Sequence, residues 1–323
     1  MISTVLLALD GSDKDDRGVA GAAALAELAR ANICVVRVVA ADYDRLSMLT
    51  GALVATNEEV DSQRAIEREL ESAAEQLRQQ IPGKVICDVV AGADVGETLL
   101  RQVEERHADF VVMATRAAGV VGRAVHGSVA DHLVRESPKP VLLVPPRAAH
   151  LSGHRLQFRR MLVPFDGSRV ALSAIQHLLA LPHADQLELV FIQVVAPERT
   201  GGYVMPPSAE ADVDPAAEWT HAGAVVAEKR LTMLADPLRS QGRHVHIRVV
   251  ESRHAHEMIL EAVRGELVEL IAMTTRGAGG LRRVVLGSVA EQVVRGSEIP
   301  VLLVTAGAAA RPRPESQEVE SQT

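Results

Sequence analysis

Hydrophobic residues along the chain fall into short uninterrupted runs that alternate with longer stretches of mixed polarity. In the first half these runs are almost wholly Val, Leu and Ile, which is typical of strands buried on both faces of a parallel sheet. The stretches between them have the length and apolar spacing of amphipathic helices. The predicted strands are residues 3–9, 33–39, 84–90, 109–114 and 141–144, and the predicted helices are about 14–30, 56–80, 95–106 and 127–136.

The second half shows the same alternation. Strands are expected near residues 161–165, 188–195, 244–250, 268–273 and 301–304, and a Gly- and Pro-rich stretch at 198–217 predicts a long mobile loop. Strands that alternate with helices across short turns favour an α/β fold with a parallel sheet and right-handed crossovers.

The two halves are copies of one unit. Asp10-Gly11-Ser12 corresponds to Asp166-Gly167-Ser168, and the segments 127–144 and 287–304 are identical at 12 of 18 positions. Because the offset is 156 residues at the first pair and 160 at the second, the second copy carries a net insertion of four residues. We therefore predict homologous domains at 1–146 and 160–306, a linker at 147–159 and a disordered tail at 307–323.

Composition and charge exclude several function classes. The net charge of −8 and the scarcity of aromatic residues (four Phe, two Tyr, one Trp) argue against a nucleic-acid partner. Two cysteines cannot form a disulfide framework or a four-thiolate zinc site. No apolar stretch approaches the roughly 18 residues of a membrane span, and the first residues lack the basic region of a signal peptide. We expect a cytoplasmic protein with no membrane partner.

The first candidate chemistry lies where the first strand of each copy ends. Asp10 and Asp166 place a carboxylate at the carboxyl edge of a parallel sheet, where ligands bind at the point of strand-order reversal. In the alternative reading, Ser12 and Ser168 only cap the following helix and the glycine only permits the turn. The residues alone leave both readings open.

A second candidate is the glycine-rich stretch 273–288, which joins the fourth strand of the second copy to a helix. A strand, a glycine-rich loop and a helix N-terminus in succession offer backbone N–H groups to phosphate. The stretch has no Gly-Lys-Ser/Thr ending and no dinucleotide-type glycine pattern.

These residues together resemble the universal stress protein family, whose pattern is G-x2-G-x9-G-S/T after the fourth strand, with an Asp ending the first. Gly277, Gly287 and Ser288 match this pattern in the second copy, while Thr274 stands at the first glycine. In the first copy the same spacing falls on Ala114, Ala117, Gly127 and Ser128.

The resemblance implies two doubly wound, Rossmann-like domains, each with a five-stranded parallel sheet of order 3-2-1-4-5. It also implies ATP binding, with Mg²⁺ able to accompany the nucleotide, and a role in stress survival. By resemblance, Asp166 approaches the adenosine, the backbone near Val195 meets the adenine, and Gly277, Gly287 and Ser288 meet ribose and phosphates. A weaker site would use Asp10, Gly127 and Ser128.

The leading hypothesis is a tandem universal stress protein that binds ATP mainly in the second domain and acts as a regulatory module with little or no turnover. Two alternatives stay open: an interaction scaffold that binds no nucleotide, and a slow ATP-hydrolysing enzyme. No catalytic residue and no metal ligand is assigned. Four histidines, His244, His246, His254 and His256, could in principle form a zinc site. We prefer to interpret His244 and His246 as the solvent face of an edge strand. The expected partners are an adenine nucleotide, the other domain through the apolar strands 141–144 and 301–304, and a second chain in a homodimer.

Overall fold

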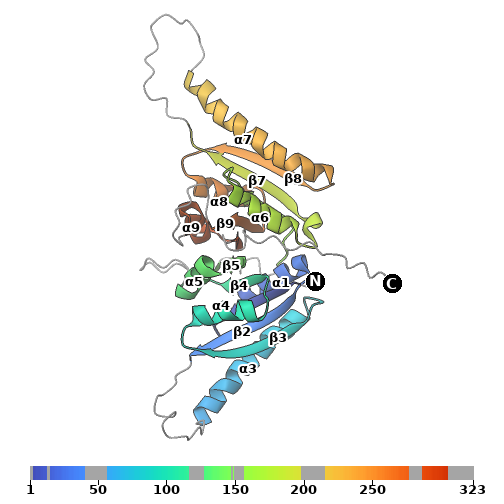
Figure 1. The fold of residues 1–323 in the computed structure, drawn as a ribbon, viewed down its shortest axis with the longest axis vertical. Helices are drawn as coiled ribbons and strands as arrows, with labels where there is room; N and C mark the ends of the chain where they lie inside the picture. Colours follow the sequence, from blue (N-terminus) through green and yellow to red (C-terminus); the bar gives the residue numbers. More distant parts are fainter. Residues whose placement is uncertain are drawn as a thin grey trace, which may run out of the picture.

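The computed structural model describes residues 3–12, 15–40, 57–115, 127–146, 148, 156–197, 215–275 and 286–304. The described strands form one ten-stranded sheet in the order β3-β2-β1-β4-β5-β10-β9-β6-β7-β8 (Figure 1). We call β1 to β5 repeat 1 and β6 to β10 repeat 2. The strands of repeat 1 are β1 (Thr4–Leu9), β2 (Asn32–Ala40), β3 (Val85–Gly92), β4 (Phe110–Ala114) and β5 (Val141–Val144). Those of repeat 2 are β6 (Arg160–Pro164), β7 (Glu188–Val195), β8 (Val245–Glu251), β9 (Leu270–Thr274) and β10 (Val301–Val304).

Within each repeat every strand pairing is parallel. Counted along its own chain segment, each repeat has the order 3-2-1-4-5. The predicted α/β fold with two repeated parallel sheets is therefore confirmed, and in each repeat the strand order reverses between the first and the fourth strand.

The repeats join through their fifth strands. β5 and β10 pair antiparallel, with Leu142 opposite Leu302, and the side chains of both residues are buried. An uncovered apolar strand at the edge of a sheet favours uncontrolled association, and here each fifth strand covers the other. The predicted pairing of the two domains along these strands is confirmed.

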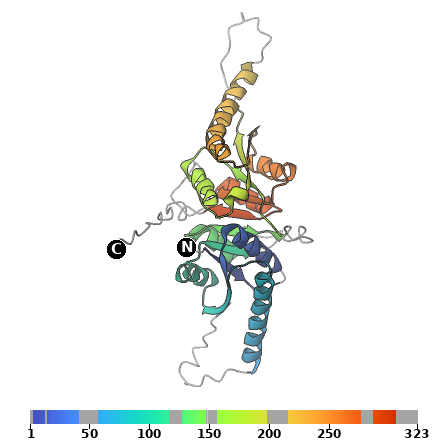
Figure 2. The same cartoon turned by 90° about the vertical axis from the view of Figure 1, so that its right-hand side faces the viewer.

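Helices cover both faces of the sheet (Figure 2). One face packs under α1 (Asp15–Ala29), α3 (Asn57–Arg78), α6 (Arg169–Leu179) and α7 (Pro215–Ser240), which share one apolar cluster with the strands. The other face packs under α4 (Val95–Glu105), α5 (Ser128–Glu136), α8 (Ala255–Gly265) and α9 (Ser288–Gly296), which share a second cluster. A short 3₁₀ helix, η2 (Ala184–Gln186), precedes β7. The long helices α3 and α7 lie toward opposite ends of the molecule (Figure 1).

One sequence expectation needs correction. Residues 215–217, predicted as part of a mobile loop, begin α7, and the rest of that stretch lies outside the described residues. The predicted linker 147–159 stays a prediction, and its residues Ala148 and Phe158 are buried in the same apolar cluster as α1 and α6. The predicted tail, 307–323, lies outside the described residues.

Candidate functional site

The turn after the first strand has the same geometry in both repeats. The Ser12 N–H donates to the Asp10 carboxylate at 3.1 Å, and the Ser168 N–H donates to the Asp166 carboxylate at 2.9 Å. The glycine between them has a φ of +74° in repeat 1 and +84° in repeat 2, a conformation that favours glycine. This turn holds each aspartate at the carboxyl edge of the sheet, where the strand order reverses.

The second part of the site is the start of the helix after the fourth strand. Gly127 precedes Ser128 at the start of α5, and Gly287 precedes Ser288 at the start of α9. The unpaired N–H groups of a helix N-terminus, with the helix dipole, attract an anion. Gly127 has a φ of +92°, and a Cβ built there would meet no atom of the described residues within 4 Å.

In repeat 1 these two parts line one cavity of about 170 Å³, which we call the switch-point cavity. Its lining includes Asp10, Gly127 and Ser128, with Leu99 and Met113 as apolar wall. The structure therefore brings together the three residues that the sequence predicted as the site of the first domain.

In repeat 2, Asp166 follows β6, and Gly287 and Ser288 open α9, as in repeat 1. The Gly287 N–H donates to the carbonyl oxygen of Thr275 at 2.7 Å. Val195 is the last residue of β7, and its carbonyl oxygen accepts the Ser252 N–H at 2.9 Å, which leaves one lone pair for a ligand. Gly277 lies outside the described residues.

Sequence reasoning missed Asp15. Its carboxylate accepts the N–H groups of Asp10 and Gly11 at 3.2 and 2.8 Å and also lines the switch-point cavity. Burial raises the pKa of the Asp15 carboxyl, although the two N–H groups oppose the shift. A comparison of the two repeats could have singled out Asp15, because repeat 2 has Ala171 at the corresponding position.

The two serines of the turn play different parts. The Ser168 hydroxyl accepts the Ala171 N–H at 3.1 Å, so it caps α6 as the capping hypothesis expected. The Ser12 hydroxyl oxygen is buried and has no hydrogen-bond partner among the described residues. In repeat 1 the capping hypothesis is therefore wrong for this side chain.

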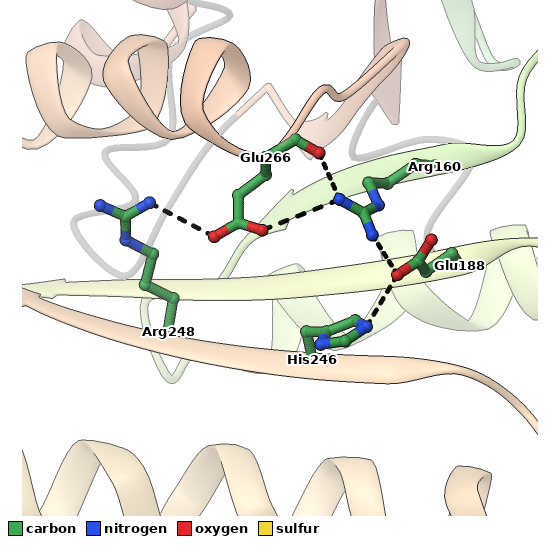
Figure 3. Close-up of polar contacts among 5 residues, drawn as sticks. All are labelled: Arg160, Glu188, His246, Arg248 and Glu266. Atoms are coloured by element: carbon green, nitrogen blue, oxygen red, sulfur yellow. Dashed lines mark hydrogen bonds and ion pairs between the residues drawn. The ribbon is translucent and has the colours of Figure 1, made fainter.

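The histidine pair of the second half lies away from this edge of the sheet. His246 contacts Glu188 at 2.7 Å in a charged cluster that also holds Arg160, Arg248 and Glu266 (Figure 3). Arg160 pairs with Glu188, and its other guanidinium nitrogen donates to the Glu266 carbonyl oxygen at 2.6 Å. The Arg160 guanidinium holds the pKa of the Glu188 carboxyl below its usual range.

This cluster lies at the amino ends of β6, β7 and β8, opposite the edge that carries Asp166. Among the described residues, no group of three or more His, Cys, Asp or Glu side chains is arranged to hold a metal ion. None of the described helices combines the length and the apolar character needed to cross a membrane.

Comparison with known proteins places this geometry in a family. The sequence profile of the universal stress protein family matches residues 1–145 and again residues 157–305. A universal stress protein of Mycolicibacterium smegmatis is 27% identical over 93% of this chain and 96% of its own length. One of Methanocaldococcus jannaschii is 31% identical over 46% of this chain and 82% of its own length.

Solved structures agree on the fold. The crystal structure of a universal stress protein from Archaeoglobus fulgidus aligns with a TM-score of 0.63 at 22% identity, covering 94% of this chain and 98% of that one. The two profile matches coincide with the two sheet halves. The chain therefore belongs to the universal stress protein family and carries two copies of its domain.

Proposed function

We propose that this protein is a regulatory module that binds ATP, mainly in repeat 2, with little or no turnover. The observation that carries the proposal is the arrangement that both repeats share, an aspartate turn and a Gly-Ser helix start at one edge of the sheet. In repeat 1, Asp10, Gly127 and Ser128 converge from these two turns in the switch-point cavity. Repeat 2 has the same residue types at the same places, in Asp166, Gly287 and Ser288.

The chemistry of these groups suits an adenine nucleotide. A fixed carboxylate accepts hydrogen bonds from amino or hydroxyl groups of the adenosine, and a helix N-terminus favours phosphate. The backbone of Val195 is the proposed adenine contact, and Gly277 is proposed to let the backbone approach the ribose and phosphates. Mg²⁺ enters this proposal only as the counter-ion of ATP.

Two differences favour repeat 2 over repeat 1. Ala117 stands where repeat 2 has Gly277. An alanine restricts the backbone conformation, and its methyl group hinders close approach of a ligand to the backbone. Asp15 adds a second carboxylate to the switch-point cavity, whereas repeat 2 has Ala171 there. A second negative charge beside the site repels a polyphosphate.

The regulatory reading rests on the sequence, in which no carboxylate, Lys or His is placed to orient a water molecule at a terminal phosphate. Phosphoryl transfer depends on a residue that orients the attacking water and on charges that stabilise the terminal phosphate. We assign no Lys, His or carboxylate of this chain to that task.

The test is equilibrium binding of ATP to the full chain. We expect one ATP per chain, lost in Gly277→Val and nearly unchanged in Asp10→Ala. Ala171→Asp, which gives repeat 2 the extra carboxylate of repeat 1, should weaken binding about tenfold, equivalent to about 1.4 kcal/mol. Two equivalent sites, or loss of binding through Asp10→Ala alone, would contradict the assignment to repeat 2. Sustained hydrolysis at about 1 per second or faster would contradict the regulatory reading.

A further inference from the structure

Repeat 1 contains a second, larger cavity beside the switch-point cavity. It has a volume of about 440 Å³ and lies between α1 and α3, above the ends of β1 and β2. We call it the α1–α3 cavity. Its floor is formed by Leu9, Val19, Leu70 and Ala73, which belong to the apolar cluster on the α1 face. Its volume falls within the range of small-molecule sites.

The cavity exists because repeat 1 has smaller or polar side chains where repeat 2 has larger apolar ones. Leu9, Asp16 and Val19 correspond to Phe165, Leu172 and Ile175 at the common offset of 156. The buried residues of α3 and α7 align at an offset of 161, with Leu70 matching Leu231 and Ala74 matching Ala235, so that Ala73 corresponds to Leu234. In repeat 2, Phe165 and Ile175 are buried, and Leu172 and Leu234 pack against the same cluster.

The wall of the cavity carries polar groups that are held in position. The Arg37 guanidinium pairs with Glu69 on α3 and lies against Gly11, where it would collide with any Cβ. The Asp15 carboxylate is fixed by the two N–H groups of the Asp10-Gly11 turn.

Ser12 adds an independent indication of a ligand. Its buried hydroxyl oxygen lacks a partner among the described residues, and Ser12 lines the cavity. A buried polar atom without a partner is costly, and rotation of the Ser12 side chain toward the cavity would let a ligand bond the hydroxyl without breaking a bond within the protein.

The charges of the wall are nearly balanced. Two guanidinium groups, of Arg37 and Arg68, face three carboxylates, of Asp15, Asp16 and Glu69. Such a wall presents donors and acceptors side by side without a surplus of positive charge for an anion. An uncharged ligand with neighbouring hydroxyl groups can donate to the carboxylates and accept from the guanidinium groups, while its C–H face covers the apolar floor.

We propose that the α1–α3 cavity of repeat 1 binds a small neutral polyhydroxylated molecule of the monosaccharide class. The α1–α3 cavity adjoins the switch-point cavity of repeat 1, with which it shares Leu9 and Asp15, but the rest of its lining comes from other residues. Because the proposed ATP site is in repeat 2, the proposal does not depend on ATP binding.

The test is titration of D-glucose and D-ribose into the full chain, followed by calorimetry and ligand-observed NMR. We expect saturable binding of at least one of these sugars at one site per chain, unchanged by saturating ATP. Ala73→Leu, the residue of repeat 2, should weaken binding at least tenfold by filling the floor. Ser12→Ala should weaken binding roughly fivefold, the effect of one neutral hydrogen bond, and should leave the unfolding midpoint unchanged or raise it, because the variant removes a buried hydroxyl that has no partner among the described residues.

Matched controls come from the other repeat. Met233→Ser, at the position that corresponds to Ser72, and Ser168→Ala should both leave sugar affinity unchanged. The proposal is overturned if neither sugar binds, or if binding survives both Ala73→Leu and Ser12→Ala. It is also overturned if inorganic phosphate or acetate, but neither sugar, binds in a manner that Ala73→Leu abolishes.

Discussion

The Arg106 guanidinium lies 2.7 Å from the Asp88 carboxylate and so joins the end of α4 to the edge strand β3. The corresponding residues of repeat 2, at an offset of 160, are Arg248 and Glu266. They form an ion pair of 3.5 Å between β8 and the end of α8, with the two charges exchanged (Figure 3). The contact has therefore kept its place in the two repeats while its polarity has reversed.

We predict that reversing the charge of Asp88 or of Arg106 alone destabilises the fold, and that reversing both together does not. Asp88→Arg or Arg106→Glu alone places like charges together and should lower the free energy of unfolding by about 0.5–1 kcal/mol, because both side chains are partly exposed. The double exchange, which reproduces repeat 2, should recover most of that loss. Urea unfolding of the four proteins gives the coupling energy. Additive effects of the two substitutions would show that the pair does not stabilise the fold.

The two turn serines should differ in their effect on stability. Ser168→Ala removes the cap of α6 and should cost about 1 kcal/mol of unfolding free energy. Ser12→Ala removes a hydroxyl that makes no hydrogen bond among the described residues and should cost little. Thermal unfolding of the two variants under one buffer checks this, and equal losses would contradict the different roles that we assign to the serines.

The joint between the repeats should depend on its central leucines. Leu142→Ala and Leu302→Ala each open a cavity at the β5–β10 pairing and should each cost about 2–5 kcal/mol. Because the two residues are direct partners, the double variant should cost measurably less or more than the sum of the single variants. Chemical denaturation measures this, and strict additivity would mean that the leucines do not contact across the joint.

Much of the fold could be predicted because it depends on local patterns. The apolar runs are strands within one or two residues of the predicted bounds, as at 141–144 and 188–195, since strands buried on both faces leave little ambiguity. The duplication by itself makes Asp10 and Asp166 equivalent positions, because both stand at one fixed offset within matching segments.

The side-chain contacts could not be predicted because they depend on distant packing. Nothing in the pattern shows that Asp15 turns back to its own turn, or that Ser12 is left without a partner among the described residues while Ser168 caps a helix. The α1–α3 cavity arises from the sizes of side chains on β1, α1 and α3 together, so no single segment reveals it. The burial of Phe158 could not be predicted either. It lies in the segment predicted as a linker, and its burial depends on an apolar cluster built from distant strands and helices.

The two cysteines show the same dependence on packing. Both lie in strands that pair with one another, yet Cys34 faces the α4 side of the sheet and Cys87 faces the α1 side. Cys34 is fully buried, and its thiol lies 3.8 Å from the Asp88 carboxylate. Burial raises the pKa of the Cys34 thiol to about 11, from an ordinary value of 9.0, and the nearby Arg106 only partly opposes this shift.

This raised pKa predicts a loss of stability at alkaline pH. Below pH 9 the thiol is protonated in both the folded and the unfolded state, so its contribution is fully present. Between pH 9 and about 11 the unfolded chain releases the proton while the folded chain keeps it, which favours unfolding by up to about 1.4 kcal/mol for each pH unit.

Urea unfolding at pH 8, 9, 10 and 11 should therefore show that the free energy of unfolding falls more steeply with pH for the natural protein than for Cys34→Ala. The variant is less stable at pH 8 because it leaves a cavity, so the difference between the two proteins should narrow as the pH rises. Parallel curves would show that ionisation of this thiol is not coupled to folding.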